Sequence, residues 1–131
     1  MENSRFKFRV WDKGNKRYQG TQDWQPYLDT DGDVCFINTD DVRDYPPENY
    51  FIIEQCTGLK DKNGKLIYEG DVIKDTGEIK YQIMWKDARF VAVAIKEFDY
   101  MPDNLLNQKW IDVWKHEIIG NIHEQAEQKD K

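Results

Sequence analysis

Two carboxylates, Glu69 and Asp71, have the residue type and spacing for chemistry, and Gly70 lies between them. Because residues two apart on a strand share a face, the pair could hold a metal ion or perform acid–base catalysis. The alternative is a structural corner in which the Asp71 carboxylate accepts hydrogen bonds from nearby backbone amides. No histidine, nucleophile or third carboxylate occurs at a supporting spacing. We therefore favour the structural role and predict no catalytic residue, metal ion or cofactor.

Two further metal candidates are weaker. The stretch Asp29-Thr30-Asp31-Gly32-Asp33 resembles the start of a calcium loop, but an EF-hand needs glycine at its sixth position and glutamate at its twelfth. Here the glycine is fourth and the twelfth residue is Asp40. The stretch is therefore predicted to be an acidic hairpin turn. His116 and His123 have no partner ligands at zinc-site spacing.

The sequence contains no phosphate-binding glycine loop, nucleophile elbow, HExxH or paired-cysteine zinc pattern. Cys35 and Cys56 lack CxxC spacing, and no charged start followed by an apolar run indicates export. We therefore expect two reduced, partly buried thiols rather than a disulfide. No apolar run reaches the length of a membrane span. These features favour a non-enzymatic protein with no membrane partner and a cytoplasmic location.

Strands and turns must position the two carboxylates. Asn63-Gly64 is the strongest two-residue turn signal, because a primed hairpin turn needs positive φ at both central positions. Gly70 then interrupts a β-prone run from Ile67 to Ile73, which predicts a bulge or a sharp corner. The resulting candidate corner, structural or functional, consists of Asn63, Gly64, Tyr68, Glu69, Gly70 and Asp71.

Alternation of apolar and polar residues, or short apolar runs between turns, predicts strands at 5–10, 50–56, 78–85, 89–95 and 117–122. Two short helical segments are also expected, one turn over Thr39–Asp44 and a helix over Asp103–Gln108. The pattern after Gly70 is typical of a small antiparallel barrel. The predicted fold is therefore mainly β and antiparallel, with one or two short helices.

The run TGLKDKNGKLIYEGDVIK, from Thr57 to Lys74, resembles the signature of the YopX family of phage and prophage proteins. Phe6–Asp12 resembles the family's opening strand, and Glu117–Glu124 resembles its closing segment. The resemblance implies a small, mainly β protein of mobile genetic elements with an SH3-like barrel in its C-terminal half. It implies no established activity, so no catalytic residue is carried over, and the cytoplasm would be that of a bacterial host.

The chain has 131 residues and is expected to form a single YopX-like domain. Within it we expect an N-terminal β part over 1–56, a barrel-like part over 57–124 and a polar tail over 125–131. The net charge of −6 is unevenly distributed. Residues 1–20 hold six basic and two acidic residues, whereas 21–54 hold nine acidic residues and one arginine. Such asymmetry can steer association.

Aromatic residues outside the evident strand cores are candidate interface residues, namely Trp24, Tyr27, Trp110 and Trp114. The sequence therefore favours a binding or regulatory module that associates with itself, as a homo-oligomer, or with a host or phage protein. A nucleic-acid-linked role is the alternative. It would be either a single-strand binder, which the net acidity opposes, or an acidic DNA mimic built on residues 21–54. An enzyme using scattered carboxylates such as Glu69 and Asp71 is a third, weaker hypothesis.

Overall fold

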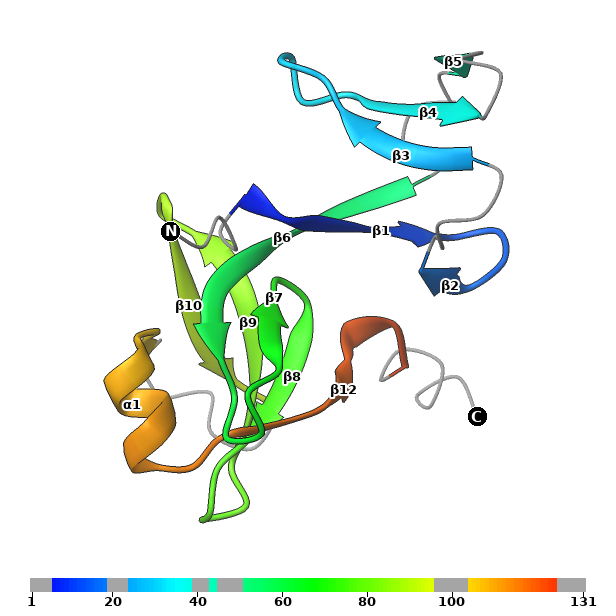
Figure 1. Cartoon of the computed structure of the whole chain (residues 1–131). Coiled ribbons are helices and arrows are strands. Elements are labelled where there is room, and N and C mark those ends of the chain that lie inside the picture. Colours follow the sequence, from blue (N-terminus) through cyan, green and yellow to red (C-terminus); the bar gives the residue numbers. More distant parts are fainter. Residues whose placement is uncertain (1–5, 19–23, 39–42, 45–50, 96–103, 125–131) are drawn as a thin grey trace. The chain divides into compact units, whose positions relative to one another are not determined.

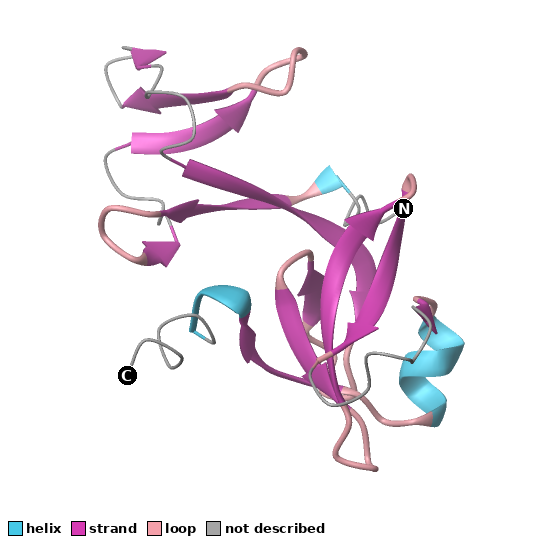
Figure 2. Ribbon diagram, turned by 180° about the vertical axis from the view of Figure 1, so that it is seen from behind, coloured by secondary structure: helices cyan, strands magenta, loops and turns pink. Residues whose placement is uncertain are grey.

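The computed structural model describes residues 6–18, 24–38, 43–44, 51–95 and 104–124 (Figure 1). The chain divides into two compact units, one formed by Phe8–Glu54 and the other by Met1–Lys7 together with Gln55–Lys131. The single domain expected from the sequence stays a prediction. Seen from behind, strands make up most of the described chain (Figure 2). The mainly β, antiparallel fold predicted from the alternation is thus confirmed.

The unit Phe8–Glu54 consists of short antiparallel strands. Strand β1 (Phe8–Asp12) pairs with β2 (Arg17–Tyr18), and β4 (Val34–Asn38) pairs with β3 (Trp24–Leu28) on one side and β5 (Arg43–Asp44) on the other. The acidic stretch that begins at Asp29 forms the turn between β3 and β4, as predicted. Cys35 in β4 is buried and unbridged, as is Cys56 in the other unit.

A buried ion pair joins the basic first strand to the end of the acidic segment. Glu54 is 2% exposed and accepts hydrogen bonds of 2.8 Å from Arg9 Nε and from the Tyr18 hydroxyl. The Arg9 guanidinium also lies 4.4 Å from the centre of the Tyr18 ring. The Arg9–Glu54 pair therefore neutralises one positive charge of residues 1–20 and one negative charge of residues 21–54 within the molecule.

The second unit contains the later strands and the helix. Strands β8 (Asp71–Lys74), β9 (Lys80–Lys86), β10 (Arg89–Ala94), β11 (Asn104–Leu105) and β12 (Glu117–Asn121) form one sheet in the order β11-β10-β9-β8-β12. Strand β6 (Phe51–Lys60) enters this unit at Gln55, and from Cys56 to Lys60 it pairs with β7 (Leu66–Tyr68). These strands curve into a half-barrel (Figure 1). Its core contains Ile67, Ile73, Tyr81, Ile83, Ala92 and Ile111.

Helix α1 (Gln108–Val113) lies later than predicted. The helix expected over 103–108 is wrong because Asn104–Leu105 pairs with β10 as strand β11. The helix begins only where the Asn107 side chain accepts a hydrogen bond of 2.8 Å from Trp110 N–H, as an N-cap. The helical turn expected over 39–44 is also wrong for Arg43–Asp44, which form strand β5. The first four residues of that turn, 39–42, lie outside the described part.

The turn at Asn63-Gly64 is the predicted hairpin tip between β6 and β7, but its type is different. Gly64 has φ of 81°, whereas Asn63 has no positive φ. Gly64 N–H donates to the Asp61 carbonyl and Asp61 N–H to the Lys65 carbonyl, which closes a three-residue loop. The Asp61 carboxylate accepts from Asn63 N–H and Lys65 N–H, both at 2.9 Å. This aspartate therefore selects the longer loop over the primed turn.

The two-residue primed turn occurs instead at Asp87–Ala88, between the paired residues Lys86 and Arg89. Both residues have positive φ, 54° at Asp87 and 62° at Ala88. The left-handed region costs a non-glycine residue about 1–2 kcal/mol, and aspartate tolerates it better than alanine does. Ala88 is therefore a strained position in an otherwise regular hairpin.

We expect Ala88→Gly to raise the free energy of unfolding by about 1 kcal/mol, because glycine adopts positive φ without a steric penalty. Ala94→Gly on the same hairpin is the matched control and should lower the free energy of unfolding, since Ala94 is part of a strand. Urea denaturation measures both variants. An Ala88→Gly protein less stable than the parent would contradict the expected relief of strain.

Candidate functional site

The predicted corner at Glu69-Gly70-Asp71 makes backbone contacts with strand β9 and with the residue that follows β12. Gly70 has φ of 89°, its N–H donates to the Ile83 carbonyl at 2.8 Å, and its carbonyl accepts from Ile122 N–H at 2.9 Å. The Asp71 carboxylate is 2% exposed and accepts from Tyr68 N–H at 2.7 Å. Glu69 lies over the backbone of Gln55, with Oε1 3.4 Å from its N–H. The Asp71 carboxylate thus bonds the backbone just before the bend, whereas that of Glu69 contacts the backbone of strand β6.

No group of three or more His, Cys, Asp or Glu side chains that could hold a metal ion occurs within the described ranges. No helix of the described chain is long and apolar enough to cross a membrane. Of the four aromatic interface candidates, Trp24 and Tyr27 lie in β3 of the unit Phe8–Glu54. Tyr27 is 47% exposed. The side chain of Trp24 lies outside the described part.

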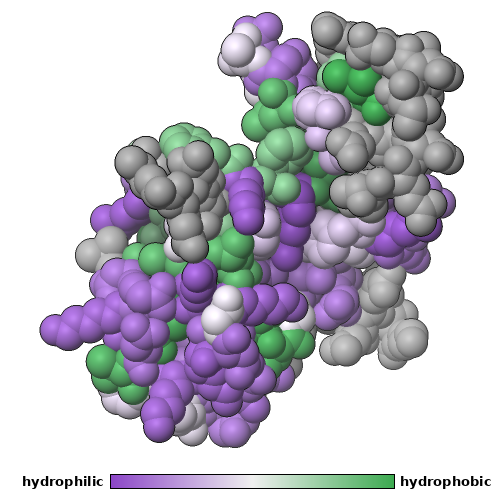
Figure 3. Space-filling view, in the orientation of Figure 1, coloured by the Kyte–Doolittle hydropathy of each residue, from purple (hydrophilic) through white to green (hydrophobic). Residues whose placement is uncertain are grey.

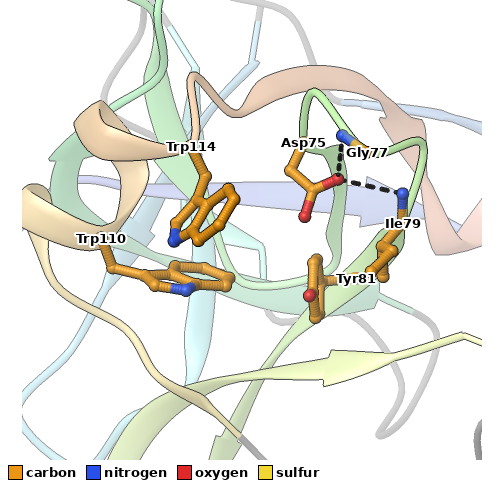
Figure 4. Close-up of a pocket in the computed structure, with 6 residues that line it drawn as sticks. All are labelled: Asp75, Gly77, Ile79, Tyr81, Trp110 and Trp114. Atoms are coloured by element: carbon orange, nitrogen blue, oxygen red, sulfur yellow. Dashed lines mark hydrogen bonds between the residues drawn. The ribbon is translucent and has the colours of Figure 1, made fainter.

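Trp110 and Trp114 do come together with other residues, in a pocket of about 240 Å³. Trp110 lies in α1 and Trp114 is its C-cap residue. The pocket is lined by Asp75, Gly77, Ile79, Tyr81, Trp110 and Trp114 (Figure 4). Trp114 is 51% exposed and forms its outer wall, whereas Tyr81 is 4% exposed and lies on the inner side. Asp75 is the one residue with a formal charge among those that line it.

The turn after β8 holds Asp75 in place. Asp75 Oδ1 accepts hydrogen bonds from Gly77 N–H at 2.9 Å and from Ile79 N–H at 3.0 Å. The backbone repeats the loop at Asp61, except that the position of Gly64 is taken by Glu78, with φ of 68°. Thr76 N–H donates to the Trp114 carbonyl at 3.2 Å, so the turn is joined directly to the end of the helix. The turn that holds the carboxylate is therefore joined to the backbone of the outer tryptophan.

Stacked rings fix the other side of the pocket. Trp110 lies edge-to-face with Tyr81, with 5.1 Å between ring centres, and packs on His116 at 4.0 Å. His116 is fully buried and its Nδ1 lies 3.3 Å from the Ile111 carbonyl. Its Nε2 has no hydrogen-bond partner in the described structure. This ring stack holds Trp110 in one orientation.

The buried rings of the stack are uncharged near neutral pH. Burial, and then the charge of Asp75, raise the pKa of Tyr81 above its ordinary 10.0. Burial lowers the pKa of His116 below its ordinary 6.5, although the Ile111 hydrogen bond and the Asp75 charge oppose the shift. The pocket therefore combines neutral aromatic rings with one carboxylate, which suits binding of an organic group better than proton transfer.

Sequence reasoning named Trp110 and Trp114 but missed Asp75, Tyr81 and His116. The signal that could have found Asp75 is the recurrence of an aspartate at the start of a turn, as at Asp29 and Asp61. No local signal connects Tyr81 to Trp110, because their contact is made only by the folding of the chain.

The described chain is a mainly β protein of antiparallel sheets with an aromatic pocket, and the comparisons with known proteins assign it to a family. A family model described as YopX protein matches residues 7–128, so the chain belongs to the YopX family, as its central run indicated. No curated protein matches it.

Two solved structures resemble it over nearly their whole length. Protein EF1440 from Enterococcus faecalis is 28% identical, with a TM-score of 0.66, over 93% of this chain and 96% of that one. Protein yopX from Bacillus subtilis is 17% identical, with a TM-score of 0.60, over 92% and 94%, a likeness that shows the fold alone.

Gly70→Val should lower the free energy of unfolding by about 1–3 kcal/mol, because a β-branched residue resists the positive φ that this corner requires. Thr76→Val, which changes an exposed turn residue with ordinary φ, is the control. Thermal and urea denaturation measure both. A Gly70→Val protein that melts like the parent would show that the corner does not depend on glycine.

We expect the free energy of unfolding to fall as the pH drops below about 6.5, because the unfolded chain binds a proton there that buried His116 resists. The slope should not exceed about 1.4 kcal/mol per pH unit, and it ends where the lowered pKa is reached. Urea denaturation between pH 7.5 and 5.5 measures it. The slope should persist in His123→Gln and vanish in His116→Gln. An unchanged slope in His116→Gln would show that other groups cause the pH dependence of stability.

Proposed function

We propose that this protein is a phage-type, non-enzymatic binding or regulatory module that acts by associating with another protein in the cytoplasm of a bacterial host. The observation that carries the proposal is the half-exposed Trp114 at the mouth of a pocket whose other side is the fixed ring of Trp110. Tryptophan is enriched among the residues that dominate binding energy at protein interfaces. Because the Trp110 ring is already fixed by Tyr81 and His116, binding against it costs little side-chain entropy.

The surroundings of the pocket fit a small anchored interface. Val113, next to Trp114, is 61% exposed. On the face seen in Figure 3, described hydrophobic residues form small patches among hydrophilic ones. A surface of this kind favours an interface in which the partner inserts one or two side chains, and it is less suited to a broad apolar interface.

The half-barrel of the second unit is the part that we assign to the SH3-like barrel implied by the family resemblance. Domains of the SH3 class bind extended peptide segments in grooves lined by aromatic side chains. The pocket between α1 and the turn after β8 gives this unit an aromatic site of comparable character. The partner can be a host or phage protein or a second copy of this chain.

A nucleic-acid-linked role has less support. The carboxylate of Asp75 lies among the pocket residues and would repel a phosphate backbone. The acidic-mimic form of this hypothesis rests on residues 21–54, of which 21–23, 39–42 and 45–50 lie outside the described part.

Trp114→Ala should reduce partner capture at least about tenfold, as expected for an interface hot spot. Trp85→Ala is the matched control, because Trp85 is 52% exposed in the same unit but does not line the pocket. Immobilised parent and variant proteins are incubated with host lysate and with phage proteins, and the retained proteins are quantified. Light scattering of the free proteins tests the self-associating form. Equal retention and equal mass for the parent and Trp114→Ala would overturn the proposed function.

A further inference from the structure

We propose that the pocket receives the side chain of an arginine carried by the partner protein, an inference that rests on the proposed function above. Four features support it: the aromatic walls, the carboxylate of Asp75, the size of the cavity and the charge of the whole chain.

The aromatic walls attract cations. Trp110, Trp114 and Tyr81 surround the space drawn in Figure 4, and tryptophan is the best of the aromatic residues at binding a cation over its ring face. Such contacts strengthen when water is excluded. Tyr81 is 4% exposed and His116, packed on Trp110, is fully buried, so a cation bound on this side would be shielded from bulk water. Both rings are neutral and so do not repel a cation.

The carboxylate of Asp75 supplies the opposite charge. Asp75 is 8% exposed, and its Oδ1 is occupied by the two backbone amides of Gly77 and Ile79. Its Oδ2 makes no hydrogen bond within the described structure and points into the pocket (Figure 4). This oxygen stays accessible from the pocket, so a ligand that covers it without donating to it would leave the carboxylate unpaired and desolvated, which is costly. A neutral apolar group would cover the oxygen and leave it unpaired.

Arginine fits this arrangement better than lysine does. The flat guanidinium is weakly hydrated, and it can stack on an indole ring while one N–H donates to a carboxylate. A lysine ammonium is compact and strongly hydrated, so it loses more hydration on entering the pocket and cannot stack flat on an indole ring. The cavity of about 240 Å³ exceeds the roughly 150 Å³ of a protein cavity that holds benzene, so it has room for the longer side chain.

The net charge of −6 acts in the same direction, since an acidic protein attracts a basic partner over a distance. The local pocket then selects which basic residue is bound.

The test compares short, otherwise neutral peptides that carry one arginine, one citrulline or one lysine. Citrulline keeps the shape of arginine and loses its charge. Binding is followed through the indole N–H signals of Trp110 and Trp114 in NMR spectra of the whole chain. The arginine peptide should bind at least about tenfold more tightly than the citrulline peptide. Equal binding of these two peptides, or tighter binding of the lysine peptide, would overturn the proposal without any variant being needed.

Asp75→Asn is the matching variant, because its amide oxygen can still accept from the backbone while the charge is lost. It should lower arginine-peptide affinity at least about tenfold, whereas Asp112→Asn, an exposed carboxylate on α1, should not. An unchanged affinity in Asp75→Asn would also overturn the proposal. If partner capture depends on Trp114 but not on Asp75 or added arginine peptide, the arginine assignment fails and association stands. If capture does not depend on Trp114, the proposed function itself fails.

Discussion

The structure depends most on one interaction, the aspartate carboxylate that accepts hydrogen bonds from the backbone amides of its own turn. Asp12, Asp29, Asp61 and Asp75 each do this at the start of a hairpin or strand connection. Turn amides that point inward would otherwise lack partners, which is costly next to a core. Burial alone would raise the pKa of Asp12, but hydrogen bonds from Asn15 and Gly14 and the charge of Arg17 bring it below its ordinary value. Each aspartate thereby fixes the length of its loop, and the loop fixes the register of the strands that follow.

At two of these turns the same carboxylate also reaches beyond its own loop. Asp61 uses its second oxygen to accept from Ile118 N–H at 3.1 Å, so the hairpin between β6 and β7 is bonded to the closing strand β12. At Asp75 the second oxygen faces the pocket instead. Because the first oxygen is already committed to the turn, the carboxylate cannot rotate freely toward solvent. The Asp75 carboxylate thus stabilises its own turn and also supplies a charge of fixed position to the pocket.

Period-two alternation predicts strands well, since burying one face of a sheet is a local requirement that every second residue must meet. It placed β9, β10 and β12 within two residues of their ends. It could not predict the loop type at Asn63-Gly64, which a side chain two positions earlier decides. The expectation of a helix just after Pro102 misplaced α1, because Asn104–Leu105 pairs with β10 and the helix begins only after its cap residue Asn107. The candidate site shows the same limit: its two tryptophans are four residues apart, but Asp75 and Tyr81 join them through the folded chain alone.

The central run Thr57–Lys74 and the aromatic pocket are parts of one structural system. Helix α1 has six residues and is too short to be stable by itself. Gln108 holds its start, with Nε2 donating to the Lys60 carbonyl at 2.8 Å and Oε1 accepting from Lys60 N–H at 3.0 Å. Lys62 N–H donates to the His116 carbonyl at 2.9 Å just beyond its end. The hairpin at Asn63-Gly64 therefore supports both ends of the segment that carries Trp110 and Trp114. Since the run ends at Lys74, directly before Asp75, it also leads into the opposite side of the pocket. The run that resembles the family signature thus helps to position the site, whereas the residues that line the pocket lie after it in the chain.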